Sequence, residues 1–178
     1  MSRAFAQGIR FCPMCGSSNL AERVPERDDR ERTTCLDCGF VRYVGPVLAA
    51  GVLVHDDQGR FCMLRRGHQP GKGKWAFPGG FVNVDEDPEQ AALRETREEA
   101  GCECELEGLL GAYPSDGPLG KRVVILVYAG RMTRCTETEC WEVQEMRWFR
   151  RDELDGLEFA FESTRAALGD FFRTRGGT

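Results

Sequence analysis

The sequence predicts an α/β fold in which a mixed sheet packs between helices, preceded by a small cysteine-rich domain. Short apolar stretches alternate along the chain with two segments of helical periodicity. Four cysteines stand as two close pairs near the beginning. The 178 residues are 41% hydrophobic and 30% charged, an ordinary composition for one good core and a small appendage. Gly45-Pro46 marks the boundary, which gives two domains, residues 1–44 and 45–178.

The first domain is organised by two Cys-x-x-Cys pairs that 19 residues separate: Cys12, Cys15, Cys35 and Cys38. This spacing suits tetrahedral thiolate coordination of Zn²⁺, and a glycine after each pair permits a tight turn. A redox Cys-x-x-Cys normally occurs singly beside a βαβ pattern, so we favour a structural zinc ribbon. Because so short a segment has little apolar material of its own, metal binding should contribute much of its folding free energy.

The zinc ribbon is not expected to bind nucleic acid. Its arginines are interleaved with acids, as in residues 26–32, and leave no basic stripe. The sequence pI is near 5.2, which also disfavours a nucleic-acid partner. We therefore expect the ribbon to act as a scaffold or as a dimerisation element, which allows a homodimer without requiring one.

The sequence favours a cytoplasmic location without a membrane partner. Residues 1–11 contain no apolar run of the signal-peptide kind, and the longest apolar run, residues 47–54, is too short to cross a bilayer. In that compartment the five cysteines outside the ribbon should be reduced thiols. They are Cys62, Cys102, Cys104, Cys135 and Cys140.

The elements of the second domain follow from its apolar pattern and its turn residues. Residues 47–54 and 60–64 predict a hairpin, and residues 75–77 a short strand that leads into Pro78-Gly79-Gly80. A helix is predicted at 88–100, two strands at 104–113 and 122–132, and a short strand at 146–149. Phe161, Leu168 and Phe171 or Phe172 recur at helical spacing, and should dock a terminal helix on the core rather than bind a ligand.

The central helix is unusually acidic and has clear ends. Asp87 can cap it, Pro88 fits its first position, Gln90 completes a capping box, and Gly101 can end it in a left-handed conformation. Between residues 85 and 103 there are eight carboxylates and two arginines, although the whole chain carries a net charge of only −5. The charge of the chain is therefore concentrated here.

Three glutamates of this helix, Glu95, Glu98 and Glu99, fall on one face, while a neighbouring face of small residues packs. Like charges at these spacings repel by about 0.2–0.5 kcal/mol per pair, a penalty that a bound cation would remove. Mg²⁺ prefers such oxygen ligands and often shares them with substrate phosphates. A solvated acidic face is the alternative. The glycines at 79 and 80, which let the backbone approach a ligand closely, favour the metal site.

Gly80, Glu86 and the segment Arg94-Glu95-Thr96-Arg97-Glu98-Glu99-Ala100-Gly101-Cys102 resemble the Nudix box, G-x5-E-x7-R-E-U-x-E-E-x-G-U. Every fixed position is filled. Thr96 and Cys102 stand at the two U positions, where the family usually has an aliphatic residue. The resemblance implies the Nudix fold, an α/β/α sandwich with a mixed sheet, over about residue 46 to the C-terminus. The ribbon and residues 157–161 are similar to zinc-ribbon Nudix hydrolases that cleave FAD or ADP-ribose.

The resemblance also implies roles for the acids. Mg²⁺ or Mn²⁺ would be held by Glu95, Glu98, Glu99 and the carbonyl of Gly80. Arg94 would orient the carboxylates, and Glu86 would complete the metal shell or position it. The general base stays open between Glu98 and an acid of the loop from Glu137 to Glu145.

Residues 65–74 are basic and rich in glycine, opposite in charge to the helix. Opposite charges on two sides of a cleft suit a phosphate ester held between metal and cations. The residues expected to contact substrate are Arg65, Arg66, Lys74, Trp75, Phe77 and Gly79. A flexible loop of solvated basic residues is the alternative for the cations, and either aromatic ring could instead pack in the core.

The expected activity is metal-dependent hydrolysis of the diphosphate linkage of an ADP-ribose or FAD type substrate to AMP and a second monophosphate. NADH and nucleoside triphosphates are alternative substrates. NADH-cleaving relatives carry a Ser-Gln-Pro-Trp-type sequence after the box, whereas residues 113–118 here read Tyr-Pro-Ser-Asp-Gly-Pro, and Pro118 lies near a proline position of the ADP-ribose hydrolases. A regulator that senses a ligand or binds nucleic acid on the same fold is the non-enzymatic alternative, which an intact set of acids disfavours.

Overall fold

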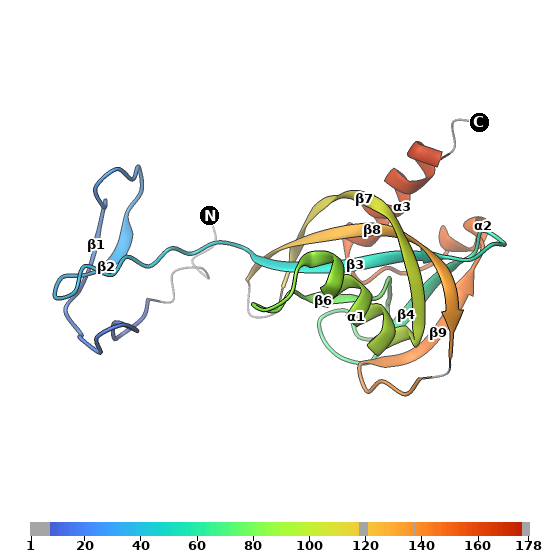
Figure 1. The fold of residues 1–178 in the computed structure, drawn as a ribbon, viewed down its shortest axis with the longest axis horizontal. Coiled ribbons are helices and arrows are strands. Elements are labelled where there is room, and N and C mark those ends of the chain that lie inside the picture. Colours follow the sequence, from blue (N-terminus) through green and yellow to red (C-terminus); the bar gives the residue numbers. More distant parts are fainter. Residues whose placement is uncertain (1–7, 118–120, 137, 176–178) are drawn as a thin grey trace. The chain divides into compact units, whose positions relative to one another are not determined.

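The computed structural model describes residues 8–117, 121–136 and 138–175 (Figure 1). The chain divides into two compact units, Met1–Gly45 and Pro46–Thr178. The first unit is built on a two-stranded antiparallel sheet of β1 (Leu20–Arg23) and β2 (Arg32–Cys35), which the sequence pattern did not predict. The second contains the remaining strands and the helices.

The four ribbon cysteines converge as predicted. Their sulfur atoms all lie within 4.8 Å of one another, and two of the four thiols are buried. Gly16 and Gly39 follow the two pairs with φ angles of 74° and 77°, a left-handed conformation that a glycine adopts without strain. Their N–H groups donate to the carbonyl oxygens of Cys12 and Cys35, which closes each turn. The predicted glycine turns are therefore confirmed.

The second unit is built on a mixed seven-stranded sheet. The strands are β3 (Val47–His55), β4 (Phe61–Arg66), β5 (Trp75–Ala76), β6 (Gly79–Phe81), β7 (Cys102–Asp116), β8 (Arg122–Cys135) and β9 (Val143–Phe149). The path runs β5-β4-β3-β8-β7, with β6 beside β3 and β9 beside β4. Among the described strands, the β3–β8 pair alone is parallel and the other pairs are antiparallel. All the predicted strands are present, and several extend beyond their predicted ends.

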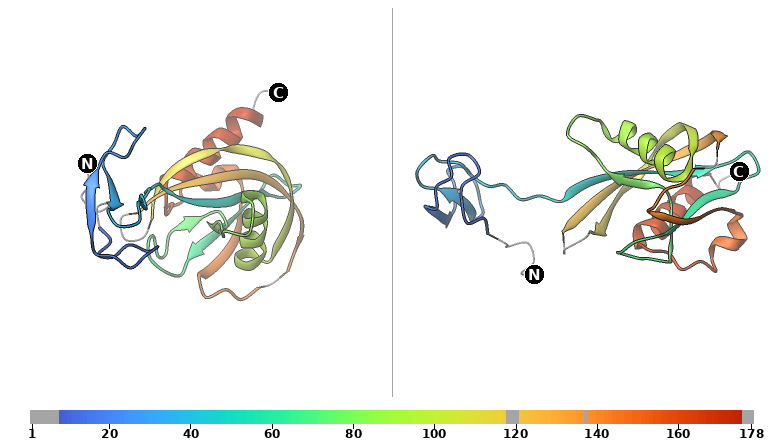
Figure 2. Two further views of the ribbon diagram at one scale, coloured as in Figure 1. Left: turned by 60° about the vertical axis from the view of Figure 1, so that its left-hand side comes forward. Right: turned by 90° about the horizontal axis from the view of Figure 1, so that it is seen from below.

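Helices cover both faces of this sheet, as the predicted α/β/α sandwich requires (Figure 2). On one face α1 (Pro88–Ala100) buries Ala91 and Ala92 in a cluster with Val52 and Val54 of β3. The intervening Leu53 belongs instead to the cluster on the other face, with residues of α3 (Glu162–Arg175). A short helix, α2 (Arg151–Leu154), was not predicted. None of the described helices is long and apolar enough to cross a membrane.

The sheet opens between β3 and β4. The first half of β3 pairs with β6, from Ala49 to Gly51, whereas β3 meets β4 only at its far end, where His55 lies opposite Phe61. Beyond that point β4, with β5 beside it, is not paired with β3, and β6 takes the place of β4 along β3. This opening leaves room for a cavity that reaches through the sheet.

One expectation for the cysteines is wrong. Cys102 and Cys135 form a disulfide between the start of β7 and the end of β8, where they lie directly opposite each other. Antiparallel pairing places their Cα atoms 4.1 Å apart. The two cysteines are 33 residues apart in sequence, so the sequence alone does not show that they are neighbours. Cys62, Cys104 and Cys140 are free, as expected.

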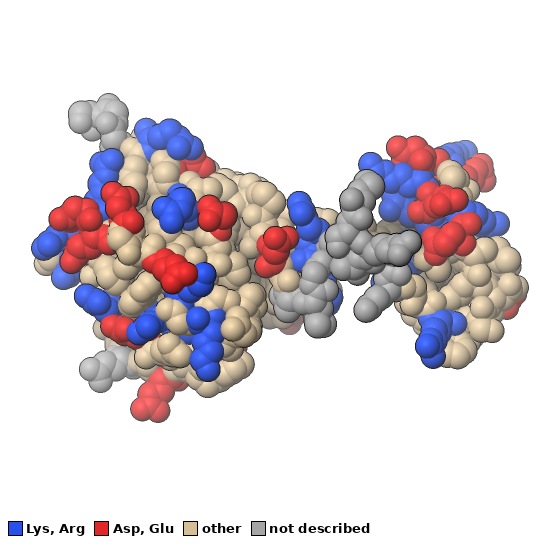
Figure 3. Space-filling model, turned by 180° about the vertical axis from the view of Figure 1, so that it is seen from behind, with Lys and Arg blue, Asp and Glu red and all other residues tan. Residues whose placement is uncertain are grey.

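Acidic and basic side chains are interspersed on the face drawn in Figure 3, on each of the two units. Neither unit shows a broad basic field on that face. The observation agrees with the interleaved charges of the ribbon sequence.

Candidate functional site

The acidic helix α1 has the limits predicted from sequence. The Asp87 side chain accepts a hydrogen bond from the Gln90 N–H, and the Gln90 side chain accepts one from the Asp87 N–H, which forms the capping box. At the other end Gly101 has φ 64° and donates to the Arg97 carbonyl. Both ends are therefore fixed by local contacts, so the rotational position of each glutamate on the helix is fixed too.

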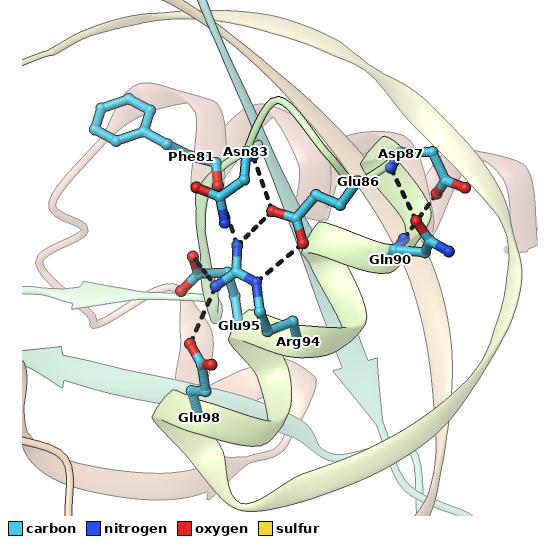
Figure 4. A network of polar contacts seen from close by, with 8 residues as sticks. All are labelled: Phe81, Asn83, Glu86, Asp87, Gln90, Arg94, Glu95 and Glu98. Atoms are coloured by element: carbon cyan, nitrogen blue, oxygen red, sulfur yellow. Dashed lines mark hydrogen bonds and ion pairs between the residues drawn. The ribbon is translucent and has the colours of Figure 1, made fainter.

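Arg94 is the centre of the acidic network in Figure 4. Its Nε and Nη2 donate to the two carboxylate oxygens of Glu86, at 3.0 and 2.7 Å. Its Nη1 donates to Glu95 at 2.8 Å and to Glu98 at 3.0 Å. Bidentate pairing of this kind fixes both partners in orientation. Arg94 thus ties the loop before the helix to two glutamates of the predicted metal set.

The loop before α1 lies against the carboxylates through two glycines. The N–H of Gly79 donates to Glu99 Oε2 at 2.9 Å. A Cβ on Gly80 would lie 2.3 Å from Glu95 Oε1, so a side chain at this position would displace the carboxylate. Backbone and acids therefore meet as closely as the Pro78-Gly79-Gly80 sequence suggested.

The three glutamates differ in their surroundings. Glu99 is buried, and loss of water from its carboxylate raises its pKa to about 7. Burial also raises the pKa of Glu95. The hydrogen bonds of Arg94 lower the pKa of Glu86 to about 2. The side chain of Glu98 is 58% exposed.

These carboxylates fit a divalent cation by their chemistry. Glu95 and Glu99 lie at the glycine loop, and burial raises the pKa of each. The neighbouring cationic side chains therefore do not fully offset the loss of water from these carboxylates. Hard cations take such oxygen ligands. Arg94 holds Glu95 and Glu98 in the geometry described here. Among the described residues, only the ribbon cysteines form a group whose ligand atoms have all converged to metal-binding distance.

A cavity of about 460 Å³ lies at the opening between β3 and β4. Its walls come from both faces of the sheet: α1 contributes Glu95 and Glu99, and the first turn of α3 contributes Ser163 and Thr164. Arg66, at the end of β4, lies between them. The cavity is large enough to hold much of a small organic ligand.

Three of the six residues expected to contact substrate line this cavity, namely Arg66, Phe77 and Gly79. Arg65, Lys74 and Trp75 are absent from its lining. Successive side chains of a strand point to opposite faces, so Arg65 lies away from Arg66 and near Glu145, at 3.7 Å. Lys74 Nζ lies 2.7 Å from Glu158, and Trp75 packs edge-on against Phe149.

Glu142 is the acid of the 137–145 loop that lines the cavity. Its backbone carbonyl accepts from the Gly67 N–H at 2.6 Å, and its carboxylate lies 3.0 Å from His68 Nε2. Glu98 does not line the cavity. Glu137, like Pro118, lies outside the described residues.

Sequence reasoning did not single out several of the lining residues. Phe161 was assigned to the docking of the terminal helix, but it precedes α3 and lines the cavity, with the Arg66 guanidinium 5.1 Å from its ring centroid. Thr164 has no sequence feature that marks it as a site residue. Leu168 and Phe171 are buried in the core, as predicted. Phe161 belongs to the segment 157–161, and Glu142 is one of the loop acids considered for the general base, but only the tertiary fold brings them together with Thr164.

The fold and the cavity define an α/β/α protein with an acidic, cation-suited site. The chain matches the family model for the NUDIX domain over residues 45–170 and the model described as Nudix N-terminal over residues 10–44. It therefore belongs to the Nudix hydrolase family and carries the N-terminal ribbon domain found in part of that family.

Two named relatives and one solved structure resemble the chain. A protein of Methanocaldococcus jannaschii named ADP-ribose pyrophosphatase is 30% identical over 140 residues, 76% of this chain and 78% of that protein. An NAD-capped RNA hydrolase NudC of Haemophilus influenzae is 28% identical over 153 residues, 84% of this chain and 54% of NudC, so this chain spans about half the length of that relative. The crystal structure of a Nudix hydrolase from Nitrosomonas europaea superimposes with a TM-score of 0.81 at 27% identity, covering 94% of this chain and 93% of the other.

Proposed function

We propose that the protein hydrolyses the diphosphate linkage of a nucleoside diphosphate derivative of the ADP-ribose or FAD type, releasing AMP and a second monophosphate. The observation that carries the proposal is a single cavity lined both by Glu95 and Glu99 of α1 and by Arg66. A diphosphate needs this combination of a cation site and a cationic side chain. The similarity to a protein named ADP-ribose pyrophosphatase supports this substrate class.

Glu95, Glu98, Glu99 and the carbonyl of Gly80 would hold Mg²⁺ or Mn²⁺ in this scheme. A divalent ion so bound supplies neutralisation of phosphate charge and a lowered pKa for water. Gly80 and Glu95 already lie in close contact. Glu98 would have to break its 3.0 Å ion pair with Arg94 before it could bind the same ion.

The two arginines have separate tasks. Arg94 fixes the orientation of Glu86 and Glu95 through the hydrogen bonds described above, and so acts as a positioning residue. Arg66 lines the cavity, and Pro70 holds its guanidinium through a 2.8 Å bond from Nε to the carbonyl oxygen. Its Nη2 lies 3.3 Å from His68 Nε2. A guanidinium carries five N–H donors, so Arg66 would bind a phosphate oxygen through its remaining N–H groups.

Glu142 is the general base that we propose. It lines the same cavity as Glu95 and Glu99 and, unlike Glu98, does not pair with Arg94. The docking of its backbone on Gly67 fixes the loop, so the carboxylate is held in place for proton removal from the attacking water. His68, 3.0 Å from its carboxylate, would orient it.

An NAD-type dinucleotide is the second candidate substrate. The similarity to NudC extends over 84% of the chain, which favours it. The sequence after the box does not carry the Ser-Gln-Pro-Trp-type segment, which disfavours it. The chemistry that the two candidates share is a P–O–P linkage between two nucleoside or sugar monophosphates.

The ribbon is proposed to hold one structural Zn²⁺ through Cys12, Cys15, Cys35 and Cys38. Its role as a scaffold or as part of a homodimer stays a prediction, as does the cytoplasmic location.

The test is hydrolysis of ADP-ribose, FAD, NADH, a diadenosine polyphosphate and nucleoside triphosphates with Mg²⁺ or Mn²⁺, with separate measurement of AMP and pyrophosphate. We expect AMP from ADP-ribose or FAD, and only when the divalent ion is present. Pyrophosphate from a triphosphate, or no metal-dependent product from any substrate, would contradict the proposal. Salt-sensitive binding of nucleic acid without hydrolysis would favour a regulator instead.

A further inference from the structure

Thr164 has a hydroxyl group without a hydrogen-bond partner. Its side chain is fully buried, and its Oγ1 is the buried side-chain oxygen or nitrogen that lacks a partner among the described residues. Thr164 also lines the cavity, at the first turn of α3. Buried hydroxyl groups are nearly always paired, so an orphan beside a cavity indicates a partner that the ligand supplies.

The surroundings of Thr164 differ from the acidic end of the cavity. The acids of α1 lie on one face of the sheet, whereas Thr164 lies on the other, where α3 packs. Apolar side chains line the cavity on this side, including Phe77, Ile125 and Phe161. Ser163, also buried, is the neighbouring hydroxyl residue in the lining.

This combination suits a flat, neutral heterocycle better than a phosphate. A phosphate here would lose water against apolar side chains and gain one neutral hydroxyl, which does not offset the desolvation of its charge. Asp116 also lines the cavity and does not attract an anion, although Arg122 lies 3.9 Å from its carboxylate. A nucleobase has apolar faces for the aromatic wall and an edge of donors and acceptors for a hydroxyl, which can itself donate and accept.

We propose that the α3 end of the cavity binds the nucleobase of the substrate, and that the Thr164 hydroxyl hydrogen-bonds to the edge of that base. The phosphates then lie toward the acids of α1, and Arg66 lies between the two parts of the cavity, with its guanidinium 5.1 Å from the ring centroid of Phe161. This inference rests on the proposed function, which supplies a nucleotide as the ligand. It makes Thr164 a specificity-determining residue that takes no part in bond cleavage.

The experiment measures binding of AMP and of ribose 5-phosphate to the full chain by calorimetry in the presence of Mg²⁺. Thr164→Val keeps the shape of the side chain and removes the hydroxyl. We expect AMP to bind about three- to tenfold more weakly to this variant, the loss typical of one hydrogen bond, while ribose 5-phosphate binds as it does to wild type. Thr164→Ser, which keeps a hydroxyl, should restore most of the affinity for AMP.

The matched control is Thr174→Val, the same substitution on an exposed position of the same helix, which should change neither affinity. Thr164→Val should also melt no lower than wild type, because it removes an unpaired buried hydroxyl. Equal weakening of both ligands would assign the hydroxyl to the sugar or phosphate and overturn the proposal. Unchanged AMP binding, or no AMP binding by wild type, would overturn it as well.

Turnover of ADP-ribose by the same preparations separates this inference from the proposed function. Selective loss of AMP binding without any diphosphate hydrolysis by wild type would retain the nucleobase site and reject the activity. Hydrolysis by wild type, with AMP binding indifferent to Thr164, would retain the activity and reject the nucleobase site.

Discussion

At the scale of single residues, Glu99 illustrates a conflict between stability and function. Its carboxylate is buried, accepts one backbone N–H, and has a pKa raised to about 7 chiefly by loss of water. The raised pKa means that the ionised form costs the folded state free energy when no cation is bound. The residue is therefore better explained by a ligand than by the fold.

The first prediction is that Glu99→Gln stabilises the protein in the presence of a chelator at about pH 8. A carboxyl group whose pKa is raised on folding does not lower the free energy of unfolding at pH values below 4.5, its pKa in the unfolded chain. As the pH rises from there through about 7, its pKa in the folded protein, the free energy of unfolding falls. Removing the charge should therefore raise the free energy of unfolding above pH 7, by at most about 3 kcal/mol, and by much less near pH 5. Denaturant unfolding of the variant and of wild type at both pH values measures the difference in the free energy of unfolding. Glu98→Gln, at an exposed position, is the control that should change little, and a Glu99→Gln variant less stable than wild type at pH 8 would contradict the account.

The second prediction concerns Glu142. If it removes a proton from the attacking water, Glu142→Gln should lower kcat by about 10²- to 10⁴-fold and leave the melting temperature close to wild type, because its backbone docking on Gly67 is kept. The matched control is Glu145→Gln, three residues away and absent from the cavity lining, which should keep near-normal kcat. Similar losses in the two variants would show that the loop, not the Glu142 carboxylate, matters.

At the scale of elements, the accuracy of prediction followed how local the determining contacts are. Helix α1 begins and ends where Asp87, Pro88 and Gly101 predict, because its caps lie within its own sequence. The hairpin of β3 and β4 was equally clear from its apolar runs and its turn. The short strands of the ribbon and α2 were missed, because four residues carry too little periodicity.

The third prediction tests the capping box. Asp87→Ala removes the side chain that accepts from the Gln90 N–H and should lower the free energy of unfolding by about 1 kcal/mol. Asp85→Ala, in the exposed loop just before it, removes the same charge without removing a cap and serves as the control. Equal stability of the two variants in urea would show that the cap contributes nothing beyond charge.

The candidate site was predictable only in part, for a related reason. The Nudix box marks Glu86, Arg94 and the glutamates because they lie within 20 residues of one another. Glu142, Phe161 and Thr164 reach the same cavity from the far end of the chain through the pairing of β9 with β4 and the packing of α3. The disulfide of Cys102 with Cys135 was missed because it depends on the register of β7 and β8.

At the scale of the whole molecule, the chain combines a small unit held by cysteines with a larger unit held by two apolar clusters. The larger unit has a core on each face of its sheet, which is sufficient for a stable domain. Over the described residues 8–45, the ribbon unit lacks such a core and exposes large apolar side chains, including Phe11, Met14 and Tyr43. Its stability should therefore depend on metal binding.

The fourth prediction is that Zn²⁺ removal unfolds the ribbon and leaves the larger unit folded. Cys12→Ser should lose the bound zinc ion and expose residues 1–45 to limited proteolysis, while a fragment that begins near residue 46 resists digestion. Cys140→Ser, outside the ribbon, should keep zinc and the intact chain. Metal analysis and mass spectrometry of the digests decide the matter, and full zinc content in the Cys12 variant would contradict the assignment.

The most direct test of the central claim is the rate of AMP release from ADP-ribose by wild type and by Glu99→Gln, each with and without Mg²⁺. The account predicts that wild type releases AMP only with the ion, and that the variant is at least about a hundredfold slower even though it is folded and, without metal, more stable. A Glu99→Gln variant as fast as wild type would contradict the claim that the buried acids of α1 hold the catalytic cation.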